Sequence, residues 1–318
     1  SGVRHNEQGQ GGRQRGRGVD GGGGVEWVGI AAGGCGEAER RRGEGRGARA
    51  AGEHNRARGR FREGQQVARA LDDTDVQLRG VMGELEVALI RGEIETAAEL
   101  APTLDALARR QAVPAITRAQ SAYMLARVDA AQGHSRLAIQ RVETLTRRSD
   151  ALGEVARLLS CREQLRLGPS DCAESLHASD ATVGARIQRL RATAAVRAGD
   201  LPIATQWLES ALALYRQQGV RAGVAATLDE LGAVFQAAGN QPGACDAWIR
   251  ALGASLAIRS AASARRITAS LSTHCAENQR TRATLLQLRG ALPDTGAVRW
   301  HQAASQLQRL QAARYPSP

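Results

Sequence analysis

The side chains that could act as acid, base, nucleophile or metal ligand are scattered along this chain. Its six histidines stand at positions 5, 54, 134, 177, 274 and 301, without HExxH, GxSxG or paired ligand spacing. His274 beside Cys275 comes nearest to a nucleophile with its base. Adjacent residues of a helix point about 100° apart, so these two side chains would not face each other. We therefore predict no catalytic residues and a protein that is not an enzyme.

Lysine chemistry is excluded as well. All 43 basic residues are Arg, because the chain contains no Lys. A phosphate-binding loop of the GxxxxGK[ST] type needs its Lys, and so do Schiff-base and pyridoxal enzymes. The sequence predicts no cofactor.

The cysteines give no sign of a metal centre. Cys35, Cys161, Cys172, Cys245 and Cys275 are odd in number and include no CxxC pair, which indicates neither a disulfide framework nor a zinc site. We expect free, mostly buried thiols. No apolar run reaches the roughly 20 residues that a membrane helix requires, so we expect a cytoplasmic protein without membrane contact.

Residues 1–64 differ in composition from the rest of the chain, being dense in Gly and Arg (GQGGRQRGRG). Such a segment buries too little apolar surface to offset its ordering entropy, and we expect a disordered arm. Residues 1–69 hold 14 Arg against 8 acidic residues. Nucleic-acid binding through residues 1–64 is thus one hypothesis. A tail without function is the other, because only Trp27 and Phe61 could stack on bases.

From Gln65 onward, Ala and Leu recur at intervals of three and four, and no alternating run suggests a strand. We predict an all-α body, with helical repeats over 65–260 and further helices over 261–318. One of these should begin near Pro293 and Asp294 and should bury Trp300 while covering the end of the array.

A glycine marks each predicted repeat, and an alanine follows it by five residues. The glycines are Gly92, Gly133, Gly168, Gly199 and Gly239, and the alanines are Ala97, Ala138, Ala173, Ala204 and Ala244. Seven residues before the glycine stands a small residue in four units: Ala126, Cys161, Ala192 and Gly232. This pattern predicts helical hairpins in which a left-handed glycine ends the first helix and small residues let the two helices approach closely.

The last unit, LDELGAVFQAAGNQPGACDAWIRAL over residues 228–252, resembles the tetratricopeptide repeat (TPR). Its repeat-defining positions are Leu231, Gly232, Phe235, Gly239, Ala244, Trp248 and Ala251. Other units depart from the pattern: Pro102 should kink or end the second helix of its unit, and the unit at Gly168 has His177 and Asp180 at expected apolar positions.

The resemblance covers about residues 80–260 and extends to the longer repeats of bacterial regulatory and signalling proteins. It implies an α-α superhelix that holds a peptide or protein on a concave face lined by the first helix of each unit. The groove candidates are Gln120, Tyr123, Arg127, Arg186, Arg189, Thr193, Asp229 and Gln236. Arg186 and Arg189, one turn apart, could bind a ligand carboxylate together, or could be solvated charges.

The function predicted on this basis is a protein–protein interaction scaffold or sensor module with a partner of unknown identity. The alternative is a fragment of a bacterial transcriptional or signalling regulator that contacts nucleic acid through its basic arm. The chain begins with Ser1 rather than Met, which is in keeping with a fragment.

Overall fold

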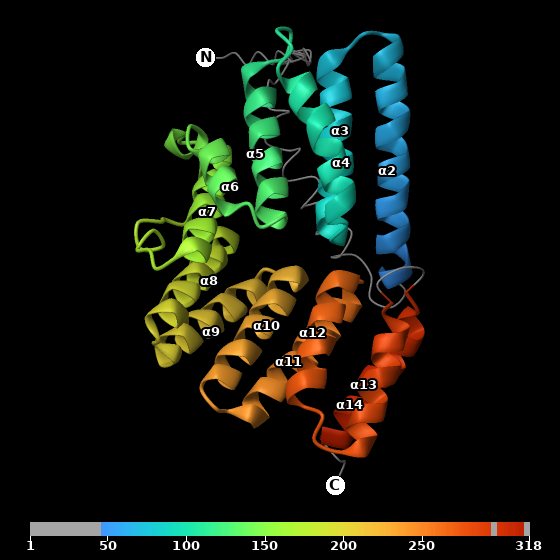
Figure 1. The fold of residues 1–318 in the computed structure, drawn as a ribbon, viewed down its shortest axis with the longest axis vertical. Coiled ribbons are helices and arrows are strands. Elements are labelled where there is room, and N and C mark those ends of the chain that lie inside the picture. Colours follow the sequence, from blue (N-terminus) through green and yellow to red (C-terminus); the bar gives the residue numbers. More distant parts are fainter. Residues whose placement is uncertain (1–45, 294–297, 315–318) are drawn as a thin grey trace, which may run out of the picture.

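The computed structural model describes residues 46–293 and 298–314, and within these ranges every regular element is a helix. The helices are α2 (Arg46–Ala70), α3 (Thr74–Arg91), α4 (Ile94–Ala108), α5 (Ala115–Ala131), α6 (Ser135–Val142), α7 (Ala151–Leu167), α8 (Ala181–Ala198), α9 (Leu201–Gln217), α10 (Arg221–Ala237), α11 (Gln241–Ala257), α12 (Ala261–His274), α13 (Gln279–Ala291) and α14 (Trp300–Arg314). A 3₁₀ turn, Leu145–Arg147, follows α6. The chain is an all-α superhelix of helical hairpins, as predicted (Figure 1).

The disordered arm predicted for residues 1–64 extends too far toward the C-terminus. Residues 1–45 lie outside the described part of the chain, but 46–64 belong to α2. This helix forms because α3 gives it a surface to pack against: Phe61 lies over Gly83, and Gln65 lies over Gly80. The amide of Gln65 also donates to Glu84 Oε1 at 2.7 Å. Tertiary packing thus orders a stretch whose composition alone predicts disorder.

Glycines end four of the first helices as predicted. Gly92, Gly133, Gly199 and Gly239 have φ between 73° and 84°, in the left-handed region. The next residue closes each turn onto the preceding helix, as when the Asn240 amide donates to the Phe235 carbonyl at 2.8 Å. Gly219, between α9 and α10, is left-handed as well, with φ 68°.

The unit at Gly168 does not follow this pattern. Gly168 has φ 174°, which is extended backbone, and no second helix follows before α8 begins at Ala181. The sequence contains the reason: Pro169 comes next, and the residue before a proline is driven from helical to extended conformations.

The small residues lie where the helices of each pair meet. Ala97, Ala138, Ala204 and Ala244 are fully buried, and Ala173 is almost so. In the last unit Gly232 lies against the indole of Trp248, so closely that an added Cβ would stand 2.5 Å from Nε1. The expected close approach of the two helices is present there.

Pro102 lies inside α4 and does not end it, so a kink is what remains of the expectation for this proline. Leu104 and Leu107 near it are buried with residues of α3 and α5. The expectation for the last helix is wrong. The last helix starts at Trp300 rather than near Pro293 and Asp294, and Trp300 is only half-buried, with the guanidinium of Arg259 5.7 Å from its ring centre.

The prediction of free thiols is wrong for four of the five cysteines. Cys161 is bonded to Cys172 and Cys245 to Cys275. Both partners of each pair come together only through the fold, with Cα atoms 5.5 and 5.8 Å apart, so cysteine spacing along the chain gave no sign of them. Cys35 lies outside the described residues.

The superhelix curves until its two halves meet. In Figure 1 the helices α2 to α5 form the upper half, α10 to α14 form the lower half, and α6 to α9 join them along one side. The end of α3 reaches the beginning of α12, where a Cβ added to Gly92 would stand 2.8 Å from the Ala262 methyl group.

The left-handed turn at Gly239 yields a stability prediction, because nothing lies within 4 Å of a Cβ added there. Any loss of stability on substitution must therefore come from backbone strain rather than from a side-chain clash. We expect Gly239→Val to lower the free energy of unfolding by about 1–2 kcal/mol. Gly239→Asn should lower the free energy of unfolding clearly less, since Asn tolerates the left-handed region. Chemical denaturation of both variants tests this, and equal losses would contradict it.

Candidate partner-binding face

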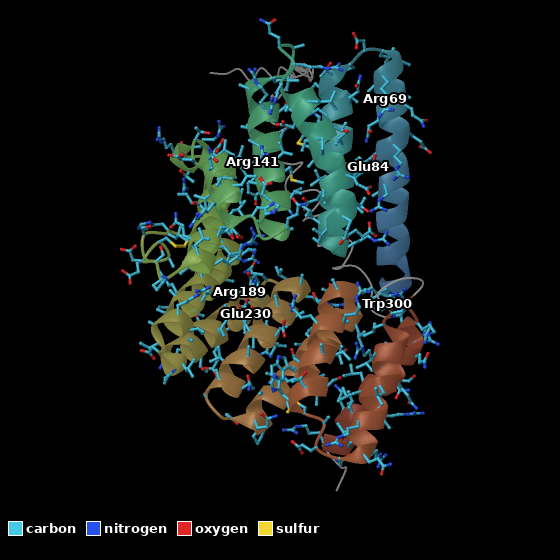
Figure 2. The ribbon with its side chains drawn as sticks, in the orientation of Figure 1. Arg69, Glu84, Arg141, Arg189, Glu230 and Trp300 are labelled. Carbon is cyan, nitrogen blue, oxygen red and sulfur yellow. A yellow bond between two sulfur atoms is a disulfide. The ribbon has the colours of Figure 1, made fainter. Side chains whose placement is uncertain are left out.

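The predicted groove residues lie on first helices of three hairpins. Gln120, Tyr123 and Arg127 are on α5, Arg186, Arg189 and Thr193 on α8, and Asp229 and Gln236 on α10. Three of the four charged members, Arg127, Arg189 and Asp229, pair with a residue on a neighbouring helix. Figure 2 shows one such pair, Arg189 and Glu230, where α8 and α10 face the middle of the molecule.

Arg127 joins α5 to α3. Its Nη1 donates to Glu86 Oε2, and its guanidinium carbon lies 5.9 Å from the ring centre of Tyr123. Burial by itself would lower the pKa of Arg127, but the charge of Glu86, with Tyr123 and the hydrogen bond to Glu86, holds the pKa above its ordinary value. Arg127 therefore keeps its positive charge.

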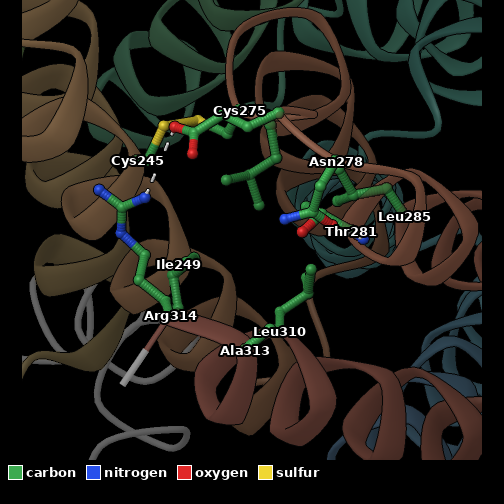
Figure 3. A pocket seen from close by; sticks show the side chains of 11 residues that line it. Cys245, Ile249, Cys275, Asn278, Thr281, Leu285, Leu310, Ala313 and Arg314 are labelled. Carbon is green, nitrogen blue, oxygen red and sulfur yellow. Dashed lines mark hydrogen bonds and ion pairs between the residues drawn. A yellow bond between two sulfur atoms is a disulfide. The ribbon is translucent and has the colours of Figure 1, made fainter. Parts of the chain in front are cut away.

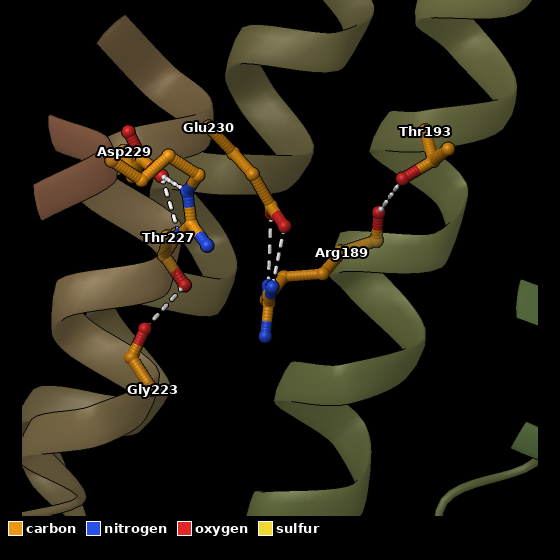
Figure 4. Close-up of polar contacts among 7 residues, drawn as sticks. Arg189, Thr193, Gly223, Thr227, Asp229 and Glu230 are labelled. Atoms are coloured by element: carbon orange, nitrogen blue, oxygen red, sulfur yellow. Dashed lines mark hydrogen bonds and ion pairs between the residues drawn. The ribbon is translucent and has the colours of Figure 1, made fainter. Parts of the chain in front are cut away.

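Arg189 joins α8 to α10 in a two-pronged contact with Glu230 (Figure 4). Nε donates to Oε2 at 2.9 Å, and Nη2 donates to Oε1. Burial would lower the pKa of Arg189, yet the hydrogen bond and charge of Glu230, helped by Tyr215, raise it above the usual value. This fork geometry is one that Arg forms and Lys cannot.

Asp229 joins α10 to α12. Both Nε and Nη2 of Arg266 donate to Asp229 Oδ2, at 2.9 and 2.7 Å. Asp229 is mostly covered, whereas Arg266 remains exposed. The α10 helix thus presents neighbouring carboxylates, Asp229 and Glu230, to arginines on opposite sides.

The partners Glu86, Glu230 and Arg266 were not among the predicted groove residues. A signal for them does exist in the sequence. The paired residues are 41, 41 and 37 positions apart, close to the intervals of 41 and 40 that separate the more widely spaced turn glycines. Opposite charges one repeat apart on first helices indicate contacts between neighbouring units.

The other predicted groove residues differ in their surroundings. Arg186 is exposed, and no carboxylate in the described ranges pairs with it. Thr193 is exposed too, and its hydroxyl donates to the Arg189 carbonyl at 3.0 Å. Tyr123 and Gln236 are partly buried. Arg186 and Arg189 share a helix face, but only Arg186 is left to bind a ligand charge.

Two hollows in the described part of the chain lie elsewhere. A cavity of about 60 Å³ is lined by the Cys245–Cys275 disulfide and Arg314, whose Nη1 is 3.9 Å from Glu277 Oε1 (Figure 3). An open hollow of about 540 Å³ lies beside the end of α12 and α13. Neither is lined by a predicted groove residue.

His274 and Cys275 both make structural contacts. Cys275 is in a disulfide, and the His274 ring stacks on Trp248 with centroids 5.5 Å apart. Across the described ranges, no group of His, Cys, Asp and Glu is placed to hold a metal ion. No helix there has the length and apolar character needed to cross a bilayer.

The Arg189–Glu230 pair should contribute more to stability than an ordinary surface pair. We expect a double-mutant cycle with Arg189→Ala and Glu230→Ala to give a coupling energy of about 1 kcal/mol, since the contact is forked and partly buried. The matched control is Arg250 with Asp246, one turn apart on the exposed side of α11, which should give about 0.3–0.5 kcal/mol. Urea denaturation measures both, and equal couplings would contradict the expectation.

Comparison with known proteins gives no family for this chain. No protein-family model matches it, and no curated protein does. Among solved structures it is similar to one described as the crystal structure of BtubC (BKLC) from P. vanneervenii. The sequences are 16% identical, and the match covers 83% of this chain and 94% of that one, with a TM-score of 0.32. The TM-score is too low for this likeness to support a statement about fold or function.

Proposed function

We propose that the chain is a non-catalytic scaffold or sensor module of TPR-like repeats that binds a protein or peptide. The observation that carries this is the packing of the last unit. Gly232 meets Trp248, Gly239 is left-handed, and Ala244 and Ala251 are fully buried, which supports the TPR-like reading of this unit.

The proposed binding face is the surface formed by the first helices α5, α8 and α10. Its paired charges, Arg127 with Glu86, Arg189 with Glu230 and Arg266 with Asp229, hold neighbouring helices in position. Arg186 remains exposed beside them. A partner that uses this face would place a carboxylate at Arg186, where a charge-assisted hydrogen bond can form.

Substitution of Arg186 tests this binding face. Immobilised full-length protein is used to isolate partners from lysate, and each partner is then titrated against Arg186→Glu and against Arg216→Glu. Arg216 is an exposed arginine of the second helix α9, so the second variant matches the change in charge. We expect Arg186→Glu to weaken binding at least about tenfold, or 1.4 kcal/mol, and Arg216→Glu to leave it unchanged. Equal effects of the two variants would place the partner elsewhere.

Nucleic-acid binding by residues 1–64 is a second proposal. It is supported by the Arg-rich composition of that segment and by the net charge of +11 of the whole chain. Protein contacts with phosphates release counterions and make affinity fall with salt.

If this second proposal holds, the full-length protein should bind duplex DNA with a steep salt dependence. Replacing Arg13, Arg15 and Arg17 by Gln should reduce the slope of log K against log salt by up to about 2.7, at 0.9 for each lost phosphate contact. Fluorescence anisotropy at several salt concentrations measures this slope. An unchanged slope would mean that these arginines make no phosphate contact.

The cytoplasmic location expected from the sequence stays a prediction. The two disulfides argue against it, because the thiol pool of the cytosol keeps most cysteines reduced.

A further inference from the structure

The unit at Gly168 is held together differently from its neighbours. Residues 168–180, which follow α7, contain no helix, whereas a second helix follows the turn at Gly92, Gly133, Gly199 and Gly239. Its loop nevertheless folds back onto α7, because Ala173 and Leu176 are buried there. Something other than a second helix must hold the loop in this place.

The Cys161–Cys172 disulfide provides that connection. Cys161 stands seven residues before Gly168, at the position where other units carry Ala126, Ala192 or Gly232. Cys172 directly precedes Ala173, the alanine five residues after the glycine, which is 1% exposed. The covalent bond thus holds Ala173 at the depth that a second helix gives the corresponding alanines.

Few other bonds fix this loop. The amide and hydroxyl of Ser179 donate to the carboxylate of Glu154 at 3.2 and 2.8 Å, in an exposed place where water competes. Two part-buried contacts are long for hydrogen bonds at 3.4 Å: Ser170 Oγ donates to Gln164 Oε1, and Arg191 Nε donates to the Ala173 carbonyl. The disulfide is therefore the strongest restraint on the loop.

The loop also takes part in the apolar contact between α7 and α8. One apolar cluster contains Leu158, Cys161 and Leu165 of α7, Ala173 and Leu176 of the loop, and Val183, Ile187 and Leu190 of α8. Loop side chains thus contribute to the apolar contact that joins α7 to α8. In Figure 1 the loop stands at the outer side of this junction.

We propose that Cys161–Cys172 is a redox latch: its reduction releases residues 168–180 from α7 and loosens the junction between α2–α7 and α8–α14. The reductant is a dithiol. One of its thiolates attacks Sγ of the half-buried Cys172 and displaces the Cys161 thiolate, which takes up a proton. The second thiol of the reductant then displaces Cys172, so that two electrons and two protons pass to the protein and the dithiol becomes a cyclic disulfide.

The second disulfide is a built-in control. Cys245 and Cys275 are both buried, and they connect α11 to the end of α12, two helices that are complete. A bond with both sulfurs covered is attacked slowly, because access limits thiol–disulfide exchange. Its loss should not affect residues 168–180.

The experiment uses the full chain with Cys35→Ser, treated with dithiothreitol for increasing times. Alkylation and mass spectrometry follow the two disulfides, and hydrogen exchange follows the backbone. We expect Cys161–Cys172 to open at least about tenfold faster than Cys245–Cys275. Amide exchange in 168–180 should then speed up at least about tenfold while that of α10 and α11 stays the same, and the radius of gyration from small-angle scattering should rise.

Two variants complete the test. Cys172→Ser should show fast exchange in 168–180 without reductant, and Cys245→Ser with Cys275→Ser should leave this segment protected. If Cys172→Ser does not fold, hydrogen exchange of the reduced wild-type protein tests the proposal instead. Reoxidation of that protein should restore slow exchange in 168–180. The proposal is overturned if Cys245–Cys275 opens first or at the same rate, if 168–180 stays protected after reduction, or if reoxidation does not restore its protection.

Discussion

The close approach of the two helices in each hairpin is the constraint on which this array depends. The chain is 42% hydrophobic but only 3% aromatic, so its cores are filled by Ala, Leu, Val and Ile, which fit only where backbones lie near each other. Ala126 and Ala138 are both fully buried in one unit, and Gly232 faces Trp248 in another. Each hairpin still leaves an apolar side uncovered, and stacking on the next hairpin covers it.

Arginine carries a second kind of contact, between neighbouring first helices. The pairs of Arg127 with Glu86 and Arg189 with Glu230 are partly buried, so the stem of each Arg can pack while its head meets the carboxylate. Such pairs add little net free energy when fully exposed and more when partly covered. The contact of Arg189 with both oxygens of Glu230 also fixes how one unit sits on the next, because a fork tolerates little rotation.

Much of the fold could be predicted from local patterns. The five-residue interval from glycine to alanine located the hairpins at Gly92, Gly133, Gly199 and Gly239, since that interval reflects a left-handed turn followed by a buried helix face. The interval failed at Gly168 because the proline after it dictates extended backbone. At Gly168 the glycine–alanine interval predicts a left-handed turn and the following proline predicts extended backbone, and the structure has extended backbone.

Contacts between distant residues were harder to predict. Cysteine pairing depends on which helices meet, and an odd count favoured no pairing. The sequence placed Arg189 on the first helix of its unit, but an exposed arginine and one paired with Glu230 have the same sequence signature. Helix α2 was missed because its order comes from α3, not from its own composition.

The contact between Gly92 and Ala262 connects two repeats that are distant along the array. In an open row of repeats each unit touches only its neighbours, so that ends fray and units melt in sequence. Here the end of α3 rests on the start of α12, and the row becomes nearly a circle. Closing it orders a long stretch of chain at once, an entropic cost that grows slowly with length. Melting of α3 or of α12 should therefore remove a neighbour from the other, which couples two parts of the chain that an open row would leave independent.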